Sequence, residues 1–146
     1  MNILNLQKEI QMDLTSVRAQ ATWASDVLIP TDDVNGMPSA TDAGMVDTLL
    51  PRALKARPDL SGAFVAALGR LPSDEPADGL DALRGLGDAE FQCVSHMIAG
   101  AYFLSDDVRL RLRYPGQEAL SLEPDYDEIQ EITDRVRARG RRYVAP

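Results

Sequence analysis

The sequence predicts an all-α protein, a compact single-domain bundle of about five to seven helices joined by long loops. Apolar residues recur at intervals of three and four along several segments, which is the period of one helix face. Proline and glycine stand mostly between those segments, where they end helices and form loops. Residues 108–114 alternate between apolar and basic side chains as a strand would, but no neighbouring segment could pair with them.

Length and composition fit one domain. The chain has 146 residues, of which 45% are hydrophobic and 26% are charged, and this suffices for one ordinary core. We expect residues 1–14 to form a flexible N-terminal arm and residues 15–146 to form a single helical domain.

The first predicted helix covers residues 16–29 and ends at Pro30, whose ring cannot continue a helix. Residues 31–44 include an Asn-Gly pair and a proline, and we expect them to form a loop. The apolar stripe of this helix consists of Leu14, Val17, Ala21, Ala24 and Leu28, with Trp23 and Val27 beside it.

Two further helices are predicted before the middle of the chain. The second begins near Thr41, where the Thr41 hydroxyl or the Asp42 carboxylate can cap it. The third begins at Pro58, because proline suits the first helical turn, and residues 71–79 follow it as an exposed loop. The expected core residues are Val46, Leu49, Leu50, Ala53 and Leu54 in the second helix and Leu60, Ala63, Phe64, Ala67, Leu68 and Leu71 in the third.

The central helix is the most apolar one. After a brief helical turn over residues 80–86, it begins with Asp88 as its N-cap. Its stripe consists of Val94, Met97, Ile98, Ala101 and Tyr102, widened by Phe91, Phe103 and Leu104. Because apolar residues occupy most of its circumference, this helix is surrounded either by its own domain or by another protein. The sequence leaves both arrangements open.

Residues 108–114 alternate between apolar and basic side chains, which taken alone is the period of a strand. A lone strand would leave its backbone groups unpaired, so we expect a short helix here, capped by Ser105 or Asp106.

The last helix is predicted over residues 127–139, on the surface, with a favourable pair of Glu131 and Arg135 one turn apart. Its narrow apolar stripe consists of Ile129, Ile132 and Val136. Basic residues gather in the last two helical segments, at Arg109, Arg111, Arg113, Arg135, Arg137, Arg139, Arg141 and Arg142. These arginines either solvate helix ends and offset the helix dipole or dock an acidic partner surface.

Charge and hydropathy exclude some partners. The net charge of -8 argues against nucleic acid, because binding to phosphates relies on Lys and Arg. No stretch approaches the roughly 20 consecutive apolar residues that cross a bilayer, so we expect no membrane insertion. The N-terminal segment also lacks the basic start and apolar run of a secretory signal. We therefore expect a cytoplasmic location, or a periplasmic one if a partner carries the export signal or the chain is processed.

No set of residues predicts catalysis. Cys93 has no second thiol, and we expect it to be a buried, unreactive thiol in an apolar helix. His96 is the only histidine, and it has neither a glutamate three residues earlier for a di-iron site nor a suitably placed nucleophile. Asp32 and Asn35 lie in a sequence with part of the pattern of a calcium loop, but the terminal bidentate glutamate is missing. We therefore expect no catalytic, metal or cofactor-binding residues in this chain.

Residues 88–117 carry the clearest resemblance to a known family. They contain the run Ala101-Tyr102-Phe103-Leu104-Ser105, then Asp107-Val108-Arg109, then Tyr114-Pro115-Gly116-Gln117. Together these residues resemble the small (third) subunit of the gluconate 2-dehydrogenase family. Val27-Leu28-Ile29-Pro30, followed by an acidic loop and Pro38-Ser39-Ala40, resembles the first landmark of that family.

The resemblance implies a noncatalytic small subunit that binds, stabilises or helps to fold a large FAD-dependent dehydrogenase of the glucose-methanol-choline type. In gluconate 2-dehydrogenases and glycoside 3-dehydrogenases of this kind, the large subunit of the heterodimer holds the FAD and oxidises a sugar, sugar acid or glycoside. Electrons then pass to a cytochrome c or another acceptor, and the small subunit itself holds no cofactor.

The family motif also implies which residues bind the partner. Arg113 stands where the family commonly has glycine, while Pro30, Pro38 and Ala40 match the first landmark. The implied partner-binding residues are Tyr102, Ser105, Val108, Tyr114, Pro115, Gly116 and Gln117.

The Tyr114-Pro115-Gly116 turn has two interpretations. It is ordinary turn chemistry, since proline fixes its own φ and glycine supplies a positive φ. It also suits an interface anchor, since an aromatic ring on a rigid turn loses little entropy on docking. The alternative function for the whole chain is a free-standing helical adaptor or regulatory protein without a dehydrogenase partner.

Overall fold

The computed structural model describes residues 14–114, 116 and 126–140. Over these residues the chain is helical, and its one extended pairing is an isolated antiparallel bridge between Asp32 and Met37. The predicted all-α class is therefore confirmed. The chain divides into two units, Met1–Gly116 and Gln117–Pro146. The predicted arm over residues 1–14 lies outside the described residues except for Leu14, whose side chain is buried.

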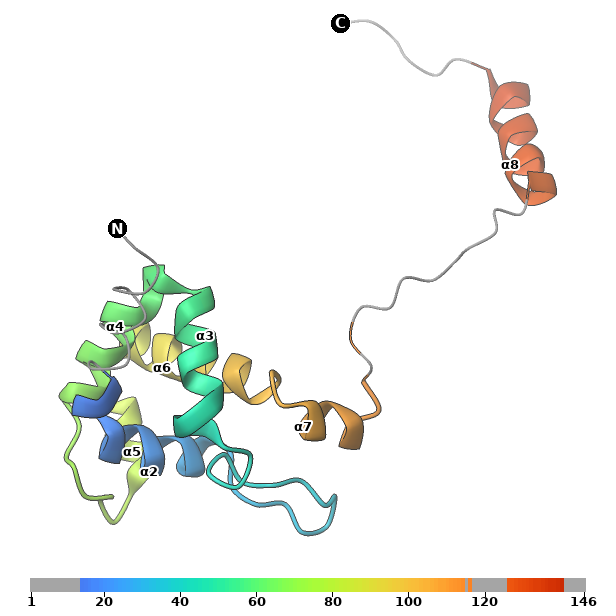
Figure 1. The fold of residues 1–146 in the computed structure, drawn as a ribbon. Coiled ribbons are helices and arrows are strands. Elements are labelled where there is room, and N and C mark those ends of the chain that lie inside the picture. The colour runs from blue at the N-terminus through green and yellow to red at the C-terminus, as the bar shows by residue number, and fades with distance from the viewer. Residues whose placement is uncertain (1–13, 115, 117–125, 141–146) are drawn as a thin grey trace, which may run out of the picture. The chain divides into compact units, whose positions relative to one another are not determined.

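The first unit contains most of the described helices (Figure 1). In chain order they are α2 (Arg18–Leu28), the π-helical turn η1 (Met45–Leu49), α3 (Leu50–Ala56), α4 (Pro58–Gly69), α5 (Gly79–Arg84), α6 (Asp88–Tyr102) and α7 (Asp106–Arg111). The central helix α6 packs chiefly against α4 and α3, and α2 packs against α5. Helix α7 follows α6 and points away from the bundle (Figure 1).

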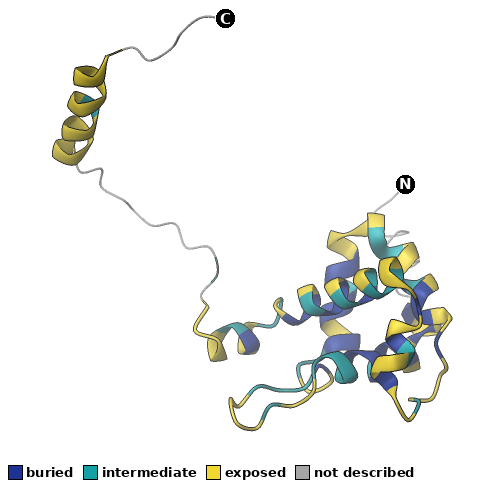
Figure 2. Cartoon of the chain, turned by 180° about the vertical axis from the view of Figure 1, so that it is seen from behind, coloured by how far each residue is buried: buried dark blue, intermediate teal, exposed yellow. Residues whose placement is uncertain are grey.

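The core of this unit forms where α2, α3, α4 and α6 meet (dark blue in Figure 2). Its largest fully buried apolar side chains are Phe64, Met45, Leu50, Leu54, Leu68, Leu83, Ile98, Val94 and Val108. The predicted stripe of α6 is buried against this core, so the helix is surrounded on that side by its own domain. Its opposite side, with Gln92, His96 and Gly100, is exposed.

The predicted core faces of the earlier helices are largely confirmed. Every predicted core residue of the second helix is buried, but on α4 Ala63 is exposed and Leu60 is only half-buried. On α2 the indole Nε1 of Trp23 donates a hydrogen bond to the Pro72 carbonyl at 3.1 Å. That bond fixes the loop after α4 on α2, because a buried indole N–H needs an acceptor.

Two predicted helix caps are wrong. The Thr41 backbone N–H and hydroxyl donate to the two carboxylate oxygens of Asp26, at 2.8 and 2.6 Å, so Thr41 is held by α2. The helix begins later, after Gly44, whose φ of 81° lies in the left-handed region that favours glycine. Likewise the N-cap of α6 is Gly87, with φ of 101°, and Asp88 is the first helical residue.

The second unit contains α8 (Tyr126–Arg139), one residue longer than predicted at its start. None of its residues is buried within this unit (Figure 2). The predicted pair also forms, with the Arg135 guanidinium 2.7 Å from the Glu131 carboxylate.

Candidate partner interface

The segment from the end of α6 to Gly116 begins with a buried tyrosine. Tyr102 is 5% exposed, and its hydroxyl donates a hydrogen bond to the Pro38 carbonyl at 2.6 Å. Burial raises the pKa of the Tyr102 hydroxyl above its ordinary value. Tyr102 therefore joins the end of α6 to the loop between α2 and η1, which lies 64 residues earlier in the chain.

Helix α7 forms for local reasons that the sequence predicted correctly. Ser105 is the N-cap, and its hydroxyl accepts a hydrogen bond from the Val108 N–H at 3.4 Å. Two aspartates stand in the first turn and two arginines in the last, the arrangement that the helix dipole favours. Val108 is the buried residue of the helix, with 0% exposure.

Arg111 ties α7 to the loop that also receives Tyr102. Its guanidinium donates from Nε to the Asp107 carboxylate at 2.8 Å and from a terminal nitrogen to the Gly36 carbonyl at 2.6 Å. Figure 1 shows this loop reaching from α2 toward α7. Together with the Tyr102 bond, Arg111 fixes the direction in which α7 leaves the bundle.

The chain turns sharply after α7. The Tyr114 N–H donates to the Arg109 carbonyl at 2.9 Å, and Arg113 has a φ of 53°. A positive φ is costly for a residue with a Cβ, so Arg113 has the backbone conformation that glycine adopts most easily. Gly116 has a φ of 90°, as predicted for the glycine of this turn.

Apolar side chains remain exposed along this segment. The residues that we call the α7 surface are Phe103, Leu110, Leu112 and Tyr114, which are 53%, 77%, 47% and 57% exposed. Leu110 and Tyr114 line the same two shallow hollows beside Arg109, of about 230 and 200 Å³. Large exposed apolar side chains that share a hollow are typical of a surface that binds another protein.

The structure divides the predicted partner-binding residues into two groups. Tyr102, Ser105 and Val108 are buried or half-buried and hold α7 in place, whereas Tyr114 is exposed. Gly116 is half-buried, and Pro115 and Gln117 lie outside the described residues. In the first landmark Ala40 is buried, Pro38 is half-buried and Pro30 is exposed.

The sequence interpretation missed Leu110 and Leu112 as exposed apolar residues, and it placed Phe103, which is also exposed, in the apolar stripe of α6. The signal was the alternation over residues 108–114. In a short helix successive residues turn by roughly 100°, so residues two apart point to nearly opposite sides. Val108 and Leu110 therefore cannot both face the core.

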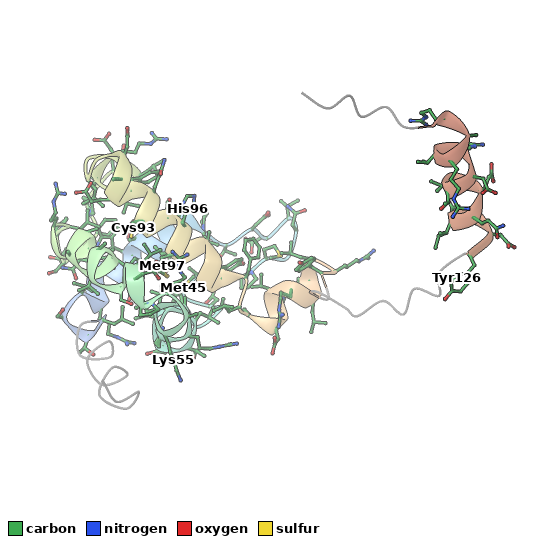
Figure 3. All side chains as sticks on the ribbon, turned by 90° about the horizontal axis from the view of Figure 1, so that it is seen from above. Met45, Lys55, Cys93, His96, Met97 and Tyr126 are labelled. Atoms are coloured by element: carbon green, nitrogen blue, oxygen red, sulfur yellow. The ribbon has the colours of Figure 1, made fainter. Side chains whose placement is uncertain are left out.

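Other candidate chemistry lies on α6, where Figure 3 labels Cys93, His96 and Met97. His96 is exposed, and Cys93 is half-buried rather than buried as predicted. Burial raises the pKa of the Cys93 thiol, and the positive charge of Arg57 opposes this shift. Among the described residues no group of three or more His, Cys, Asp or Glu side chains is placed to hold a metal ion.

In the loop with part of the pattern of a calcium loop, the Asp32 carboxylate accepts hydrogen bonds from residues of the loop itself. The Asp32 side chain accepts hydrogen bonds from the Val34 N–H, the Asn35 N–H and the Asn35 side-chain amide. These bonds, above all those of Asn35, lower the pKa of Asp32. They make this loop a tight turn, closed by the bridge between Asp32 and Met37.

An apolar hollow of about 230 Å³ lies between α3, α4 and α6, lined by Ala53, Ala56, Arg57, Leu60, His96, Met97, Gly100 and Leu104. Pockets for small molecules usually measure about 300 to 1,000 Å³. The volume of this hollow lies below that range.

These features define an all-α domain with a closed core and an apolar surface at one end. None of the helices in the described ranges combines the length and hydropathy needed to span a bilayer. Comparison of the chain with models of protein families, with curated proteins and with solved structures finds no match.

Proposed function

We propose that this chain is a noncatalytic small subunit that binds and stabilises a large FAD-dependent dehydrogenase acting on a sugar, sugar acid or glycoside. The FAD and the reaction belong to the large subunit, which passes electrons to a cytochrome c or another acceptor. The observation that carries the proposal is the α7 surface, a set of exposed apolar side chains held in a fixed direction on a closed core.

Three properties of this surface suit a permanent partner. Phe103, Leu110 and Tyr114 are each more than half exposed, so a partner would remove substantial apolar area from water. The bonds of Tyr102 and Arg111 to the loop hold the surface before docking, which lowers the entropy cost of binding. The residues from Tyr102 to Gln117 that carry the clearest resemblance to the family lie in this same segment.

A free-standing adaptor is the second candidate, and the closed core favours it. Phe64, Leu68, Val94 and Ile98 are fully buried within the described unit. The domain therefore has a hydrophobic core of its own and does not need a partner to complete it. In this case the α7 surface would bind a partner without flavin.

Isolation of the chain with its natural partner tests the proposal. The tagged chain is purified from its native cells at moderate ionic strength, and the eluate is scanned for flavin absorbance. We expect a yellow complex with a larger second component that oxidises sugars with an artificial electron acceptor. A colourless eluate, with the chain alone or with a partner free of flavin, would contradict the proposal, and the latter outcome favours the adaptor.

Substitutions then test the surface itself. Leu110→Gln and Tyr114→Ser each remove an exposed apolar side chain without touching the core. An interface anchor contributes about 2 kcal/mol or more, so each variant should bind the large subunit about thirtyfold more weakly. Leu80→Gln on α5 is the matched control, since Leu80 is 37% exposed and lies outside the α7 surface. Equal retention of all three variants would rule out this surface.

A further inference from the structure

The loop between α2 and η1 contains the pair Asn35-Gly36, whose chemistry the proposed function does not use. Both residues are exposed. Asparagine is a thermolabile residue, because the backbone nitrogen that follows it can bond to its side-chain carbonyl carbon and close a five-membered ring. Glycine permits this approach best, since it has no Cβ and the widest choice of backbone angles. The pair is therefore a candidate site of spontaneous modification.

The fold leaves the reacting atoms of this pair accessible. The Gly36 N–H donates no hydrogen bond to any of the described residues, so the Gly36 nitrogen is available to react. The Asn35 side-chain amide donates to the Asp32 carboxylate at 2.6 Å, and the Asn35 N–H donates to the same carboxylate at 3.1 Å. Both bonds are exposed, and the net contribution of an exposed hydrogen bond is small. Breaking the side-chain bond should therefore slow ring closure by about tenfold at most.

The chain has one comparable pair, Asp78-Gly79, in which the aspartate side chain could close the same ring. There the fold opposes the reaction. The Asp78 carboxylate caps α5 by accepting from the Asp81 N–H at 2.9 Å, and Gly79 is buried beside Val27. Ring closure would require the start of α5 to separate from α2. Exposure and an unbonded N–H thus distinguish Asn35-Gly36 from this second pair.

We propose that Asn35 is a site of spontaneous deamidation whose products loosen the attachment of α7. The Gly36 nitrogen loses its proton to solvent and forms a bond to Cγ of Asn35, while the bond from Cγ to Nδ2 breaks and Nδ2 leaves as ammonia after taking up a proton. Water then adds to one of the two carbonyl carbons of the resulting succinimide and breaks the bond from that carbon to the Gly36 nitrogen. Opening at the side-chain carbonyl gives aspartate, and opening at the main-chain carbonyl gives isoaspartate. The net reaction takes up water and releases ammonia.

Both products change the loop at the point where it holds α7. The Gly36 carbonyl accepts a hydrogen bond from the Arg111 guanidinium at 2.6 Å. Aspartate places a carboxylate where the Asn35 amide now donates to the Asp32 carboxylate, so that like charges meet. Isoaspartate also adds a methylene to the main chain before Gly36, within the turn that the bridge between Asp32 and Met37 closes. Either change displaces the Gly36 carbonyl and weakens its bond to Arg111. The inference does not depend on the proposed dehydrogenase.

Peptide mapping by mass spectrometry tests the modification. The full folded chain and the same chain in guanidinium chloride are incubated at mildly alkaline pH, and the peptide with Asn35 is followed for a mass gain equal to water minus ammonia. We expect the folded chain to convert at a rate within about tenfold of that of the unfolded chain. Asn2 and Asn5 are internal controls that should lag far behind, because the bulky side chains of Ile3 and Leu6 hinder the attacking nitrogen.

Variants test the consequence for α7. Asn35→Asp reproduces one product, and the amides of α7 should exchange hydrogen between about twofold and tenfold faster than in the natural chain. Val34→Asp is the matched control, because Val34 is 93% exposed and the same charge is added without removing the donor to Asp32. Its α7 exchange should match that of the natural chain. Asn35→Gln would need a six-membered ring and should stay intact.

Three outcomes would overturn the inference. The first is a folded chain in which Asn35 stays intact, whether or not the unfolded chain converts, because the turn or the sequence then prevents the reaction. The second is an equal mass gain in Asn35→Gln, which places the modification elsewhere. The third is equal exchange of the α7 amides in Asn35→Asp and Val34→Asp, which shows that the Asn35 amide does not support the attachment of α7.

Discussion

The close approach of α5 to α2 at Gly79 yields the sharpest prediction about this fold. Gly79 is the first residue of α5 and is buried. A Cβ added there would lie 2.7 Å from one methyl carbon of Val27 and 3.5 Å from the other, with Trp23 also at 3.5 Å. Non-bonded carbons pack best at roughly 3.5 to 4.0 Å, so Gly79→Ala forces a shift.

Rotation of the Val27 side chain does not relieve this contact. Both methyl groups face Gly79, and a β-branched residue in a helix has one strongly preferred rotamer. The two helices must therefore separate, at a typical overpacking cost of about 1 to 3 kcal/mol. The gain in helix propensity is small at a first helical position, so we expect Gly79→Ala to lower the free energy of unfolding by about 1 to 2 kcal/mol.

Urea denaturation followed by far-ultraviolet circular dichroism measures this loss. Gly62→Ala is the matched control, because Gly62 lies inside α4 with nothing within 4 Å of its added Cβ. That substitution should raise stability by roughly 0.5 to 1 kcal/mol. Adding Val27→Ala to Gly79→Ala should recover part of the loss. If Gly79→Ala is as stable as Gly62→Ala, the described packing of α5 on α2 is wrong.

Three other substitutions test single interactions. Tyr102→Phe removes the bond to the Pro38 carbonyl and should lower the free energy of unfolding by about 0.5 to 1.5 kcal/mol in urea denaturation. Burial raises the pKa of Tyr102 in the folded protein above 10.0. The contribution of the neutral Tyr102 hydroxyl to the free energy of unfolding is therefore complete below about pH 10 and is lost as the pH rises further. Tyr102→Phe should therefore make stability depend less on pH in the alkaline range. Ser25→Ala should leave stability unchanged or raise it by up to about 1 kcal/mol by the same assay, because the Ser25 hydroxyl is buried with no hydrogen-bond partner among the described residues. Arg113→Val should cost about 1 kcal/mol or more relative to Arg113→Gly in thermal unfolding of the α7 segment, and equal stability would contradict the positive φ there.

Helix periodicity predicted most of the fold, because the buried face of a long helix repeats many times. The apolar stripes of α4 and α6 each extend over three or more turns. The wrong prediction that Ala63 is buried therefore does not change which face of α4 is predicted to pack in the core. The helix starts could not be predicted as well. Thr41 looks like an N-cap in sequence, but Asp26, 15 residues earlier, takes both its donors in the fold.

The π-helical turn before α3 was missed for a related reason. The Met45 N–H donates to the Ala40 carbonyl and the Leu49 N–H to the Gly44 carbonyl, each five residues earlier. The residues that the stripe predicts to be buried, such as Val46, Leu49 and Leu50, are buried here as well, so the stripe does not reveal the turn.

The segments that carry the family resemblance also explain why the site was predicted only in part. They meet in space, since Tyr102 binds the Pro38 carbonyl and Arg111 binds the Gly36 carbonyl. A motif that contains Tyr102, Ser105 and Val108 therefore specifies how α7 is attached, and any protein with this attachment needs those residues whether or not it binds a dehydrogenase. Leu110 and Leu112 are absent from the motif, yet their side chains are exposed. Loss of binding in Leu110→Gln would consequently test function, whereas loss of binding in a Tyr102 variant would test only the fold.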